Sequence, residues 1–432
     1  MIIELKRGWG TISIPKVENF SFQNDDITQL VEFTENRGWQ ELNKENGKYN
    51  LKPLKGYVVQ CKTDTTINIP SETKSEWRET NTLTLDYTIE GFSDSLYMNT
   101  EGTKVLVVSH NDKTKVITYN LNIDSWVKSD ELVLDNALFN EKNTTKSFTC
   151  NDDCNVFAIS ANDGVSGLVY VYKHIDNKWT RIDNDQIKSS PDELEFGDTL
   201  KINSNGNTLA ISLTNKTDMK SYVHVYNYTD KWVRKDNNTL ISDSFISYGD
   251  IIEFNKTGSV MALSITDENL NGGVILYKNK GDAGWEKYND TLLIENCEYV
   301  SSMHLNDDGN RLIVGVVNDN NGVILMYVND NNNWVKRGNT LVGNNEGFGS
   351  MISVNSYGTK MIVGEYDSNV ITISLYNLHG DEWDNSNTSI SFKNEREINN
   401  LMTCLDIEGK TILLNNNNKL KTYNYESKQY LL

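Results

Sequence analysis

Residues 305–315 read LNDDGNRLIVG. The first half, NDDG, resembles part of a calcium loop, because Asp and Asn supply the oxygen ligands that Ca²⁺ prefers. The second half, RLIVG, has the composition of a β-strand. Whether the stretch is a metal site or a turn depends on whether it recurs along the chain.

It recurs seven times. The first turn position holds an Asn or Asp spaced 49 to 52 residues from the previous one, at Asn99, Asn151, Asn203, Asn255, Asn306, Asn355 and Asp406. An Asn or Asp there can bond a backbone N–H two residues later, which gives the column a structural cause. Three residues on, a tight turn needs positive φ, and a glycine follows in every copy except at Cys154: Gly102, Gly206, Gly258, Gly309, Gly358 and Gly409. Most copies offer one carboxylate or none, so we predict a turn and no metal.

A second column confirms the period. Tryptophans recur every 49 to 53 residues, and a tyrosine precedes most of them. They are Trp77, Trp126, Trp179, Trp232, Trp285, Trp334 and Trp383. We interpret them as covering the hydrophobic layers between sheets. A ring of exposed tryptophans that stack on carbohydrate is the functional alternative, but the regular spacing at strand starts favours packing.

Each unit reads as four short strands with period-two alternation, such as RLIVGVV and GVILMYV in the fifth unit. Seven such units predict an all-β fold, a seven-bladed β-propeller over residues 74–432 with four-stranded blades. The last unit supplies three strands, and we expect the segment EWRETNTLTL around Trp77 to add the outermost fourth strand and close the ring.

The run from Trp334 to Trp383 resembles the FG-GAP-like repeat of integrin-α-type propellers, with Phe348 and Gly349 at the name-giving pair. Weaker copies of the pair are Phe196-Gly197 and Tyr248-Gly249, and the resemblance covers residues 76–432. Similar arrays occur in bacterial surface proteins and in giant DNA viruses of amoebae. The Tyr-to-Trp spacing is also similar to kelch repeats, and the fold resembles WD40-like topology. Integrin propellers carry a D-x-D-x-D-G loop that this chain lacks, so the resemblance implies no calcium dependence.

Residues 1–73 lie outside the repeat. Trp9, Trp39 and the pair Gly56-Tyr57 resemble a small β module of bacterial surface proteins, which implies an attachment domain. Between them, Ile27, Leu30 and Val31 stand at helical spacing behind Asp25 or Asp26, which predicts one short helix. Residues 70–76, PSETKSE, read as a linker.

Composition limits the partners. A net charge of -19 spread along the chain disfavours nucleic acid and anionic membranes, and no apolar run is long enough for a signal peptide or a membrane span. Five scattered cysteines fit a reducing compartment. We therefore expect a protein made in the cytoplasm, with no membrane insertion and no cofactor.

The chain contains no P-loop, dinucleotide-binding pattern, HExxH or G-x-S-x-G motif. One acidic set recurs after the second strand of successive units, where it would place carboxylates on one propeller face: Asp112, Asp163, Asp218, Asp267, Asp319 and Asp367. Loop aspartates that bond their own backbone are the simpler explanation, and an interaction site is the functional one.

Two functions follow as hypotheses. The first is a non-catalytic structural or interaction protein that docks protein partners, in its specific form a virion-associated protein that binds capsid or other virion proteins. The alternative is a propeller glycosidase or a carbohydrate-binding lectin, for which the expected inner strands offer four acids: Glu195, Asp198, Asp250 and Glu253.

Overall fold

The computed structural model describes most of the chain, namely residues 2–5, 7–13, 20–22, 25–34, 38–44, 48–51, 56–68, 75–84, 95–109, 113–122, 125–134, 147–162, 166–182, 187–241, 245–288, 291–318, 321–367, 370–393, 403–416 and 419–427. The chain divides into two compact units. Unit 1 comprises Met1–Glu76 with Tyr425–Leu432, and unit 2 comprises Trp77–Asn424.

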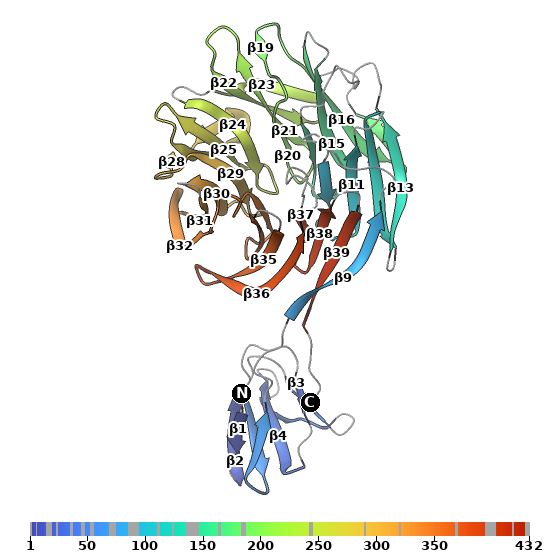
Figure 1. Cartoon of the computed structure of the whole chain (residues 1–432), viewed down its shortest axis with the longest axis vertical. Helices are drawn as coiled ribbons and strands as arrows, with labels where there is room; N and C mark the ends of the chain where they lie inside the picture. The colour runs from blue at the N-terminus through green and yellow to red at the C-terminus, as the bar shows by residue number, and fades with distance from the viewer. Residues whose placement is uncertain are drawn as a thin grey trace. The chain divides into compact units, whose positions relative to one another are not determined.

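Unit 2 is built from seven antiparallel sheets around a central axis, which confirms the predicted seven-bladed propeller (Figure 1). We number the blades in chain order. From the axis outward, blade 1 consists of β10 (Ser95–Met98), β11 (Lys104–Ser109), β12 (Lys115–Asn122) and β13 (Ser125–Val133), and blade 2 consists of β14 (Phe148–Cys150), β15 (Val156–Asn162), β16 (Gly167–Ile175) and an outer strand in two pieces, β17 (Lys178–Arg181) and β18 (Ile187–Lys188). Blade 3 begins with an inner strand in two pieces, β19 (Glu193–Leu194) and β20 (Leu200–Ile202), followed by β21 (Thr208–Asn215), β22 (Ser221–Tyr228) and β23 (Trp232–Ile241). Blade 4 consists of β24 (Phe245–Phe254), β25 (Val260–Asp267), β26 (Gly272–Asn279) and an outer strand in two pieces, β27 (Trp285–Lys287) and β28 (Leu292–Leu293).

The remaining blades follow the same order. They consist of: blade 5, β29 (Tyr299–Leu305), β30 (Arg311–Asn318), β31 (Asn321–Asp330) and β32 (Asn333–Val342); blade 6, β33 (Met351–Val354), β34 (Lys360–Asp367), β35 (Val370–His379) and β36 (Glu382–Lys393); blade 7, β37 (Thr403–Leu405), β38 (Thr411–Asn416), β39 (Lys419–Ser427) and β9 (Ser75–Thr84). A 3-10 turn, η1 (Gly281–Ala283), lies between β26 and β27.

Blade 7 closes the ring as predicted. Its outermost strand is β9, which precedes all other propeller strands in the sequence and lies beside β39 (Figure 1). Side chains reinforce this pairing, since Lys421 Nζ lies 2.8 Å from Glu79 Oε2 and Thr80 Oγ1 donates to Thr422 O at 3.3 Å. The pairing covers an edge of β39 that would otherwise expose unpaired backbone groups.

The stretch at residues 305–315 is a tight turn between β29 and β30. Gly309 has φ +66° and its N–H donates to Asn306 O at 2.9 Å. The other glycines of the column have φ between +65° and +69°, and Cys154 adopts φ +51° in the same slot. The side-chain bond predicted to the N–H two residues later is wrong in its partner. Asn306 Oδ1 accepts the N–H groups four and five residues later, from Asn310 at 3.0 Å and Arg311 at 2.9 Å.

The turns also bond to one another around the axis. The residue that follows the turn Asn donates its backbone N–H to the carbonyl oxygen of the matching residue in the next blade. Lys256 donates to Asp307 O at 3.3 Å, and Asp307 donates to Ser356 O at 2.9 Å. The Ile407 N–H donates to Thr100 O at 2.8 Å, which joins blade 7 to blade 1. The turn therefore holds both a hairpin and the contact between neighbouring blades.

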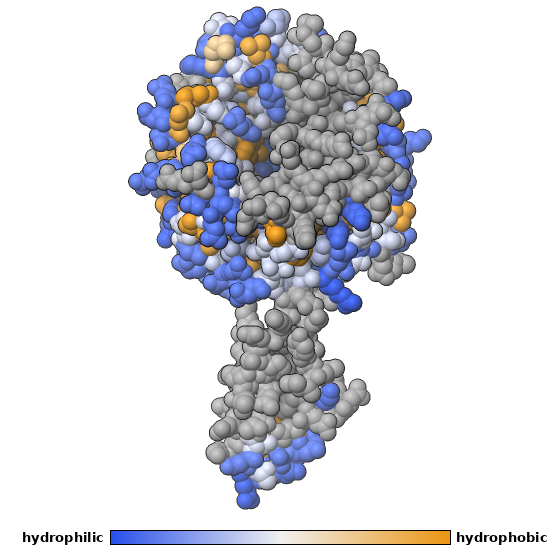
Figure 2. Space-filling view, viewed as in Figure 1, coloured by the Kyte–Doolittle hydropathy of each residue, from blue (hydrophilic) through white to orange (hydrophobic). Residues whose placement is uncertain are grey.

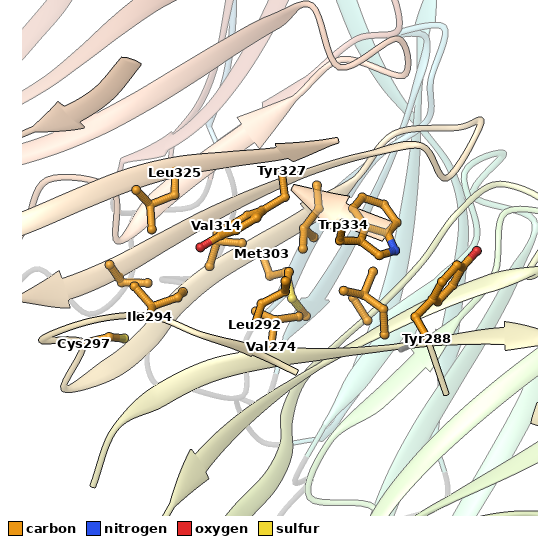
Figure 3. Close-up of a cluster of buried hydrophobic side chains, with 14 of the residues drawn as sticks. Val274, Tyr288, Leu292, Ile294, Cys297, Met303, Val314, Leu325, Tyr327 and Trp334 are labelled. Carbon is orange, nitrogen blue, oxygen red and sulfur yellow. The ribbon is translucent and has the colours of Figure 1, made fainter. Parts of the chain in front are cut away.

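Hydrophobic layers fill the spaces between blades. Figure 3 shows the layer between blades 4 and 5, where Trp334 lies beside Tyr288, and Val314, Leu325 and Tyr327 face Val274 and Leu292. Six of the seven column tryptophans lie in such layers, and five of these are buried: Trp126, Trp179, Trp232, Trp334 and Trp383. Trp285 is half-buried in the layer between blades 3 and 4.

The FG-type pairs share one local geometry. Gly197, Gly249 and Gly349 have φ of +86°, +82° and +78°. A methyl group on Gly249 would meet Val223 Cγ2 at 2.8 Å and one on Gly349 would meet Ile324 Cγ1 at 3.0 Å, both on the third strand of the preceding blade. The glycine therefore permits a positive φ where two blades approach closely.

Unit 1 contains a four-stranded sheet in the order β2 (Gly8–Ser13), β7 (Gly56–Cys61), β4 (Ile27–Thr34) and β5 (Gly38–Glu41). Two pairs accompany it, β1 (Ile2–Leu5) with β8 (Thr65–Asn68), and β3 (Phe20–Phe22) with β6 (Tyr49–Leu51). The helix predicted behind Asp25 or Asp26 is wrong, because Ile27, Leu30 and Val31 lie in β4, and Asp25 and Asp26 form the turn before it. A bulge between Ile27 and Gln29 explains the error. It puts Ile27 and Leu30 on the same buried face although they are three residues apart.

Candidate functional site on the loop face and in the central channel

The propeller has two ends with different chemistry. The second strand of each blade runs away from the Asn–Gly turn, so the loop after it lies at the opposite end. We call the end with the Asn–Gly turns the turn face. The end with the loops between second and third strands, and with the passages from one blade to the next, is the loop face.

Three of the six recurring aspartates lie within the described residues, and these three are at the loop face. Asp218 and Asp267 are described in full, Asp367 ends β34 with its side chain outside the described residues, and Asp112, Asp163 and Asp319 lie outside the described ranges altogether. The proposed ring therefore stays a prediction, which two members now illustrate.

Asp267 organises its own loop. Its Oδ1 accepts the N–H groups of Asn269 at 2.9 Å and Asn271 at 2.8 Å, and its Oδ2 accepts Asn271 Nδ2 at 3.0 Å. The hydrogen bonds from Asn271 lower the pKa of the Asp267 carboxyl. Asp218 accepts the Tyr222 hydroxyl at 2.8 Å in the same way. Both carboxylates hold a loop in shape and carry a negative charge at the loop face.

Exposed apolar side chains gather on the same face. By strand register they lie at the ends of second and fourth strands, at the starts of first and third strands, or in the loops between them: Val133, Leu194, Met219, Ile241, Ile246, Leu270, Leu293, Tyr299, Val342 and Val370. Among the described residues, fewer large apolar side chains are exposed at the turn face: Val127, Ile175, Val233 and Tyr357. In Figure 2, orange side chains stand out among blue ones over the sector of β24 and β28. Sequence patterning missed this feature, because an exposed apolar residue at a strand end reads as part of the strand's buried pattern.

The central channel opens into a cavity of about 190 Å³ near the turn face. Its wall carries three polar side chains at matching positions of blades 3, 4 and 5, namely Lys201, Glu253 and His304. Lys201 Nζ lies 2.7 Å from Glu253 Oε1. His304 Nε2 lies 2.7 Å from Ile352 O, so this nitrogen carries the proton, and burial lowers the pKa of the imidazole.

Residues of the Asn–Gly turns complete the cavity. Lys256 Nζ lies 3.1 Å from Asp307 Oδ2, and this hydrogen bond raises the pKa of the Lys256 ammonium. Asp152 accepts a hydrogen bond from the Ser204 hydroxyl, and burial raises the pKa of the Asp152 carboxyl. The charged groups of the cavity thus already have partners on neighbouring blades, and these contacts join blades 2 to 5.

Of the four acids considered for glycosidase chemistry, Glu253 alone lines this cavity, and its carboxylate forms an ion pair with Lys201. Glu195 accepts the Thr214 hydroxyl at 2.8 Å and Asp250 accepts the Ser247 hydroxyl, while Asp198 is exposed. Glu253 therefore reaches the cavity without the other three acids. Those three lie near one another, since the Asp198 N–H donates to Glu195 O at 3.0 Å and Thr199 Oγ1, beside Asp198, donates to Asp250 O at 3.1 Å.

The described histidines are dispersed as well. His174 pairs with Asp130 at 3.2 Å between blades 1 and 2, His224 with Glu193 at 2.8 Å in blade 3, and His379 with Asp384 at 2.8 Å in blade 6. Within the described ranges, no three His, Cys, Asp or Glu side chains are placed to share a metal ion. No helix in the described part of the chain is long and apolar enough to cross a membrane.

No protein-family model and no curated protein matches the sequence. Solved structures do resemble the fold. One chain of a mitotic checkpoint complex matches with a TM-score of 0.53 at 12% identity, covering 83% of this chain and 95% of that chain. A chain of hydrazine synthase from Kuenenia stuttgartiensis matches with a TM-score of 0.51 at 10% identity, covering 84% of this chain and 100% of that one. At such low identity the likeness concerns the fold alone, and it agrees with the all-β propeller described above.

Proposed function

We propose that this chain is a non-catalytic interaction protein, in which the propeller binds protein partners through its loop face and unit 1 serves as an attachment module. The observation that carries the proposal is the gathering of exposed apolar side chains on the loop face, with Met219, Ile246 and Leu270 each more than half exposed. Exposed apolar groups that share one face are typical of protein-binding surfaces.

The channel supports the same proposal. Catalysis of glycoside hydrolysis requires two carboxyl groups at a defined separation on either side of the bond. Glu253 is bonded to Lys201, and the other candidate acids lie towards the loop face or bond neighbouring side chains. The contact with Lys201 gives Glu253 a structural role in joining blades 3 and 4, and the bonds of Glu195 and Asp250 lie within single blades.

The test compares binding with turnover on the full chain. Purified protein is used for chemical cross-linking and capture in extracts of the producing cells, and the same preparation is screened on a glycan array and against a panel of glycoside substrates. We expect cross-links to partner proteins from loop-face residues and no hydrolysis. If hydrolysis occurs and Glu253→Gln abolishes it, the protein is an enzyme and the proposal fails.

A more specific form places the protein in a virion. The FG-GAP-like repeat and the Asn-rich composition resemble repeat proteins of amoebal giant DNA viruses, and five free cysteines, four of them buried, suit synthesis in a reducing cytoplasm. Partners would then be capsid or other virion proteins. Mass spectrometry of purified virions of the source virus tests this form, and failure to detect the chain there would remove it while leaving the interaction function standing.

A further inference from the structure

The loop face of blades 4 and 5 combines four exposed apolar side chains, Ile246, Leu270, Leu293 and Tyr299, whose exposed fractions are 59%, 67%, 54% and 49%. They come from four different segments. Strand pairing brings these segments to one end of the propeller, since Phe245, beside Ile246, pairs with Asp267, and the Leu270 N–H donates to Asp267 O at 3.0 Å.

The other two residues join the same patch through Gly272. The Gly272 N–H donates to Cys297 O at 2.8 Å, and a methyl group on Gly272 would lie 3.2 Å from Tyr299 Cα. Leu293 pairs with Gly273, the next residue. The four apolar side chains therefore surround one small region of backbone, which we call the blade 4–5 sector.

Charge in this sector has a single sign. The described residues that form it, 245–250, 266–273 and 291–300, contain no lysine or arginine. They carry acids, of which Asp250, Glu268, Glu295 and Glu298 are exposed and form no ion pair with a described lysine or arginine. On the turn face of blade 4, by contrast, lysines predominate, with Lys256, Lys278, Lys280 and Lys287. Acids accompany these lysines, since Lys256 pairs with Asp307 and Lys280 with Glu286, so the two ends of this blade differ in charge composition.

We infer that the blade 4–5 sector is the docking surface for a partner protein that presents leucine-like apolar side chains flanked by lysine or arginine. This inference rests on the proposed interaction function and names the sector and the chemistry of the partner. Burial of the apolar side chains supplies affinity, and acids around them select a basic rim and repel acidic competitors. The low local density of positive charge excludes an acidic or phosphorylated partner at the same place.

The probes are three synthetic amphipathic peptides of about twelve residues with one shared leucine pattern, in which every polar position is lysine, glutamine or glutamate. Binding to the full chain is measured by fluorescence anisotropy at about 50 and about 300 mM NaCl, because surface charge effects weaken over this range. We expect the lysine peptide to bind at least about tenfold more tightly than the glutamine peptide, and the glutamate peptide not to bind.

Two matched triple variants distinguish the effect of the sector's own charges on peptide binding from the effect of the protein's overall negative charge. Glu268→Gln, Glu295→Gln and Glu298→Gln remove three charges from the sector. Glu101→Gln, Asp153→Asn and Asp308→Asn remove three exposed charges from the same position of three Asn–Gly turns, and so change the net charge equally. The sector variant should lose about fivefold or more in affinity for the lysine peptide and most of the salt dependence, and the turn variant less than about twofold.

A second pair tests the apolar component. Leu270→Ser with Leu293→Ser should weaken lysine-peptide binding about tenfold, whereas Val127→Ser with Val233→Ser, exposed on the turn face, should leave it unchanged. Thermal melting checks that all variants fold.

Equal loss in both triple variants, no effect of the leucine pair, or no binding of the lysine peptide would overturn the inference. Sedimentation that shows self-association abolished by the leucine pair would reassign the sector to a second copy of the chain and also overturn it. Cross-links to partners outside the sector would leave the interaction function intact, so the two proposals fail separately.

Discussion

A methyl group added at Gly206 would meet Cγ2 and Cβ of the buried Val156 at 2.8 and 2.9 Å, whereas one added at Gly102 would meet nothing closer than 3.6 Å. Both glycines occupy the same turn slot with φ +69°. The free energy of unfolding of the Gly102→Ala variant should therefore fall by about 1 kcal/mol, the cost of positive φ for a residue with a Cβ. Gly206→Ala should lose about 1 to 2 kcal/mol more, because Val156 is β-branched and stiff. Urea unfolding of the two variants measures the difference, and equal midpoints would contradict the role of the blade contact.

The indole groups offer a second comparison. Trp126 Nε1 donates to Thr422 Oγ1 at 2.8 Å and Trp179 Nε1 donates to Thr118 Oγ1 at 3.2 Å, each on the third strand of the preceding blade. The residues at the corresponding position in blades 2 to 6 are apolar: Val171, Val225, Leu276, Met326 and Leu375. Accordingly, four indole N–H groups have no hydrogen-bond partner among the described residues: those of Trp232, Trp285, Trp334 and Trp383.

Thr422→Val should therefore cost about 1 to 2 kcal/mol, because it leaves the buried Trp126 N–H unpaired at nearly constant volume. The reverse change, Val171→Thr, gives Trp232 an acceptor, and we expect it to be neutral or to stabilise by up to about 1 kcal/mol. Thermal melting of both variants tests this, with Val225→Thr beside Trp285 as a second copy of the reverse change. A stabilising Thr422→Val would show that the indole bonds contribute nothing.

His224 makes stability depend on pH. It is buried, and burial lowers its pKa although Glu193 Oε1 lies 2.8 Å from its Nε2. Burial raises the Glu193 pKa, but hydrogen bonds from His224 and Ser190 outweigh it, so that pKa is lowered as well. Below about pH 6.5 the unfolded chain binds a proton that folded His224 does not, so stability must fall as the pH drops towards the lower folded value.

His224→Gln keeps a donor near Glu193 and removes the titration. Its free energy of unfolding should vary less between about pH 7 and about pH 5 than that of the wild type, where one such group contributes at most about 1.4 kcal/mol per pH unit. His304 in the channel wall, whose pKa is also lowered, keeps part of the dependence in the variant. His379→Gln, at an exposed site, is the control, and the inference fails if both variants retain the full wild-type slope.

At the scale of elements, β9 pairs with β39 of the last blade, and its Leu83 packs against the layer between blades 7 and 1. A chain that begins at residue 85 lacks this strand and leaves the edge of β39 unpaired, whereas one that begins at residue 74 keeps it. We expect the shorter chain to melt on the order of 10 °C lower and to aggregate as its concentration rises, because an exposed edge invites pairing with other chains. Circular dichroism and light scattering compare the two, and identical melting would show that β9 does not close the ring.

Elements could be predicted where they repeat and not where they occur once. The Asn–Gly turn and the tryptophan column appear in every unit, so accidents of composition average out and the strands of the propeller follow. Residues 25–34 occur once, and there the bulge in β4 spaces Ile27 and Leu30 as a helix would. A bulge adds one residue to a period of two, which local sequence patterning cannot distinguish from a helical turn.

At the scale of the whole molecule, the candidate site depended on information that the period does not contain. The repeat placed Asp218 and Asp267 after second strands, but which end of the propeller exposes Ile246, Leu270 and Leu293 follows only from the strand register and the paths between blades. By contrast, the pairing of Lys201 with Glu253 joins residues 52 positions apart, which is one repeat period, so the repeat indicates that the two lie at matching positions of neighbouring blades.

The division into two units predicts two unfolding transitions. Each unit has its own buried core, with Leu30 and Val59 in unit 1 and Val314 in the layer between blades 4 and 5 of unit 2. Val59→Ala and Val314→Ala each remove two methyl groups from a fully buried position, at a cost of about 2 kcal/mol. In scanning calorimetry of the full chain, Val59→Ala should lower only the transition with the smaller enthalpy, and Val314→Ala only the larger one, because enthalpy scales with the number of residues that unfold. A blade cannot bury its faces without its neighbours, so the larger transition should remain a single peak in Val314→Ala. One shared transition that both substitutions lower would mean that the two units fold as one cooperative body.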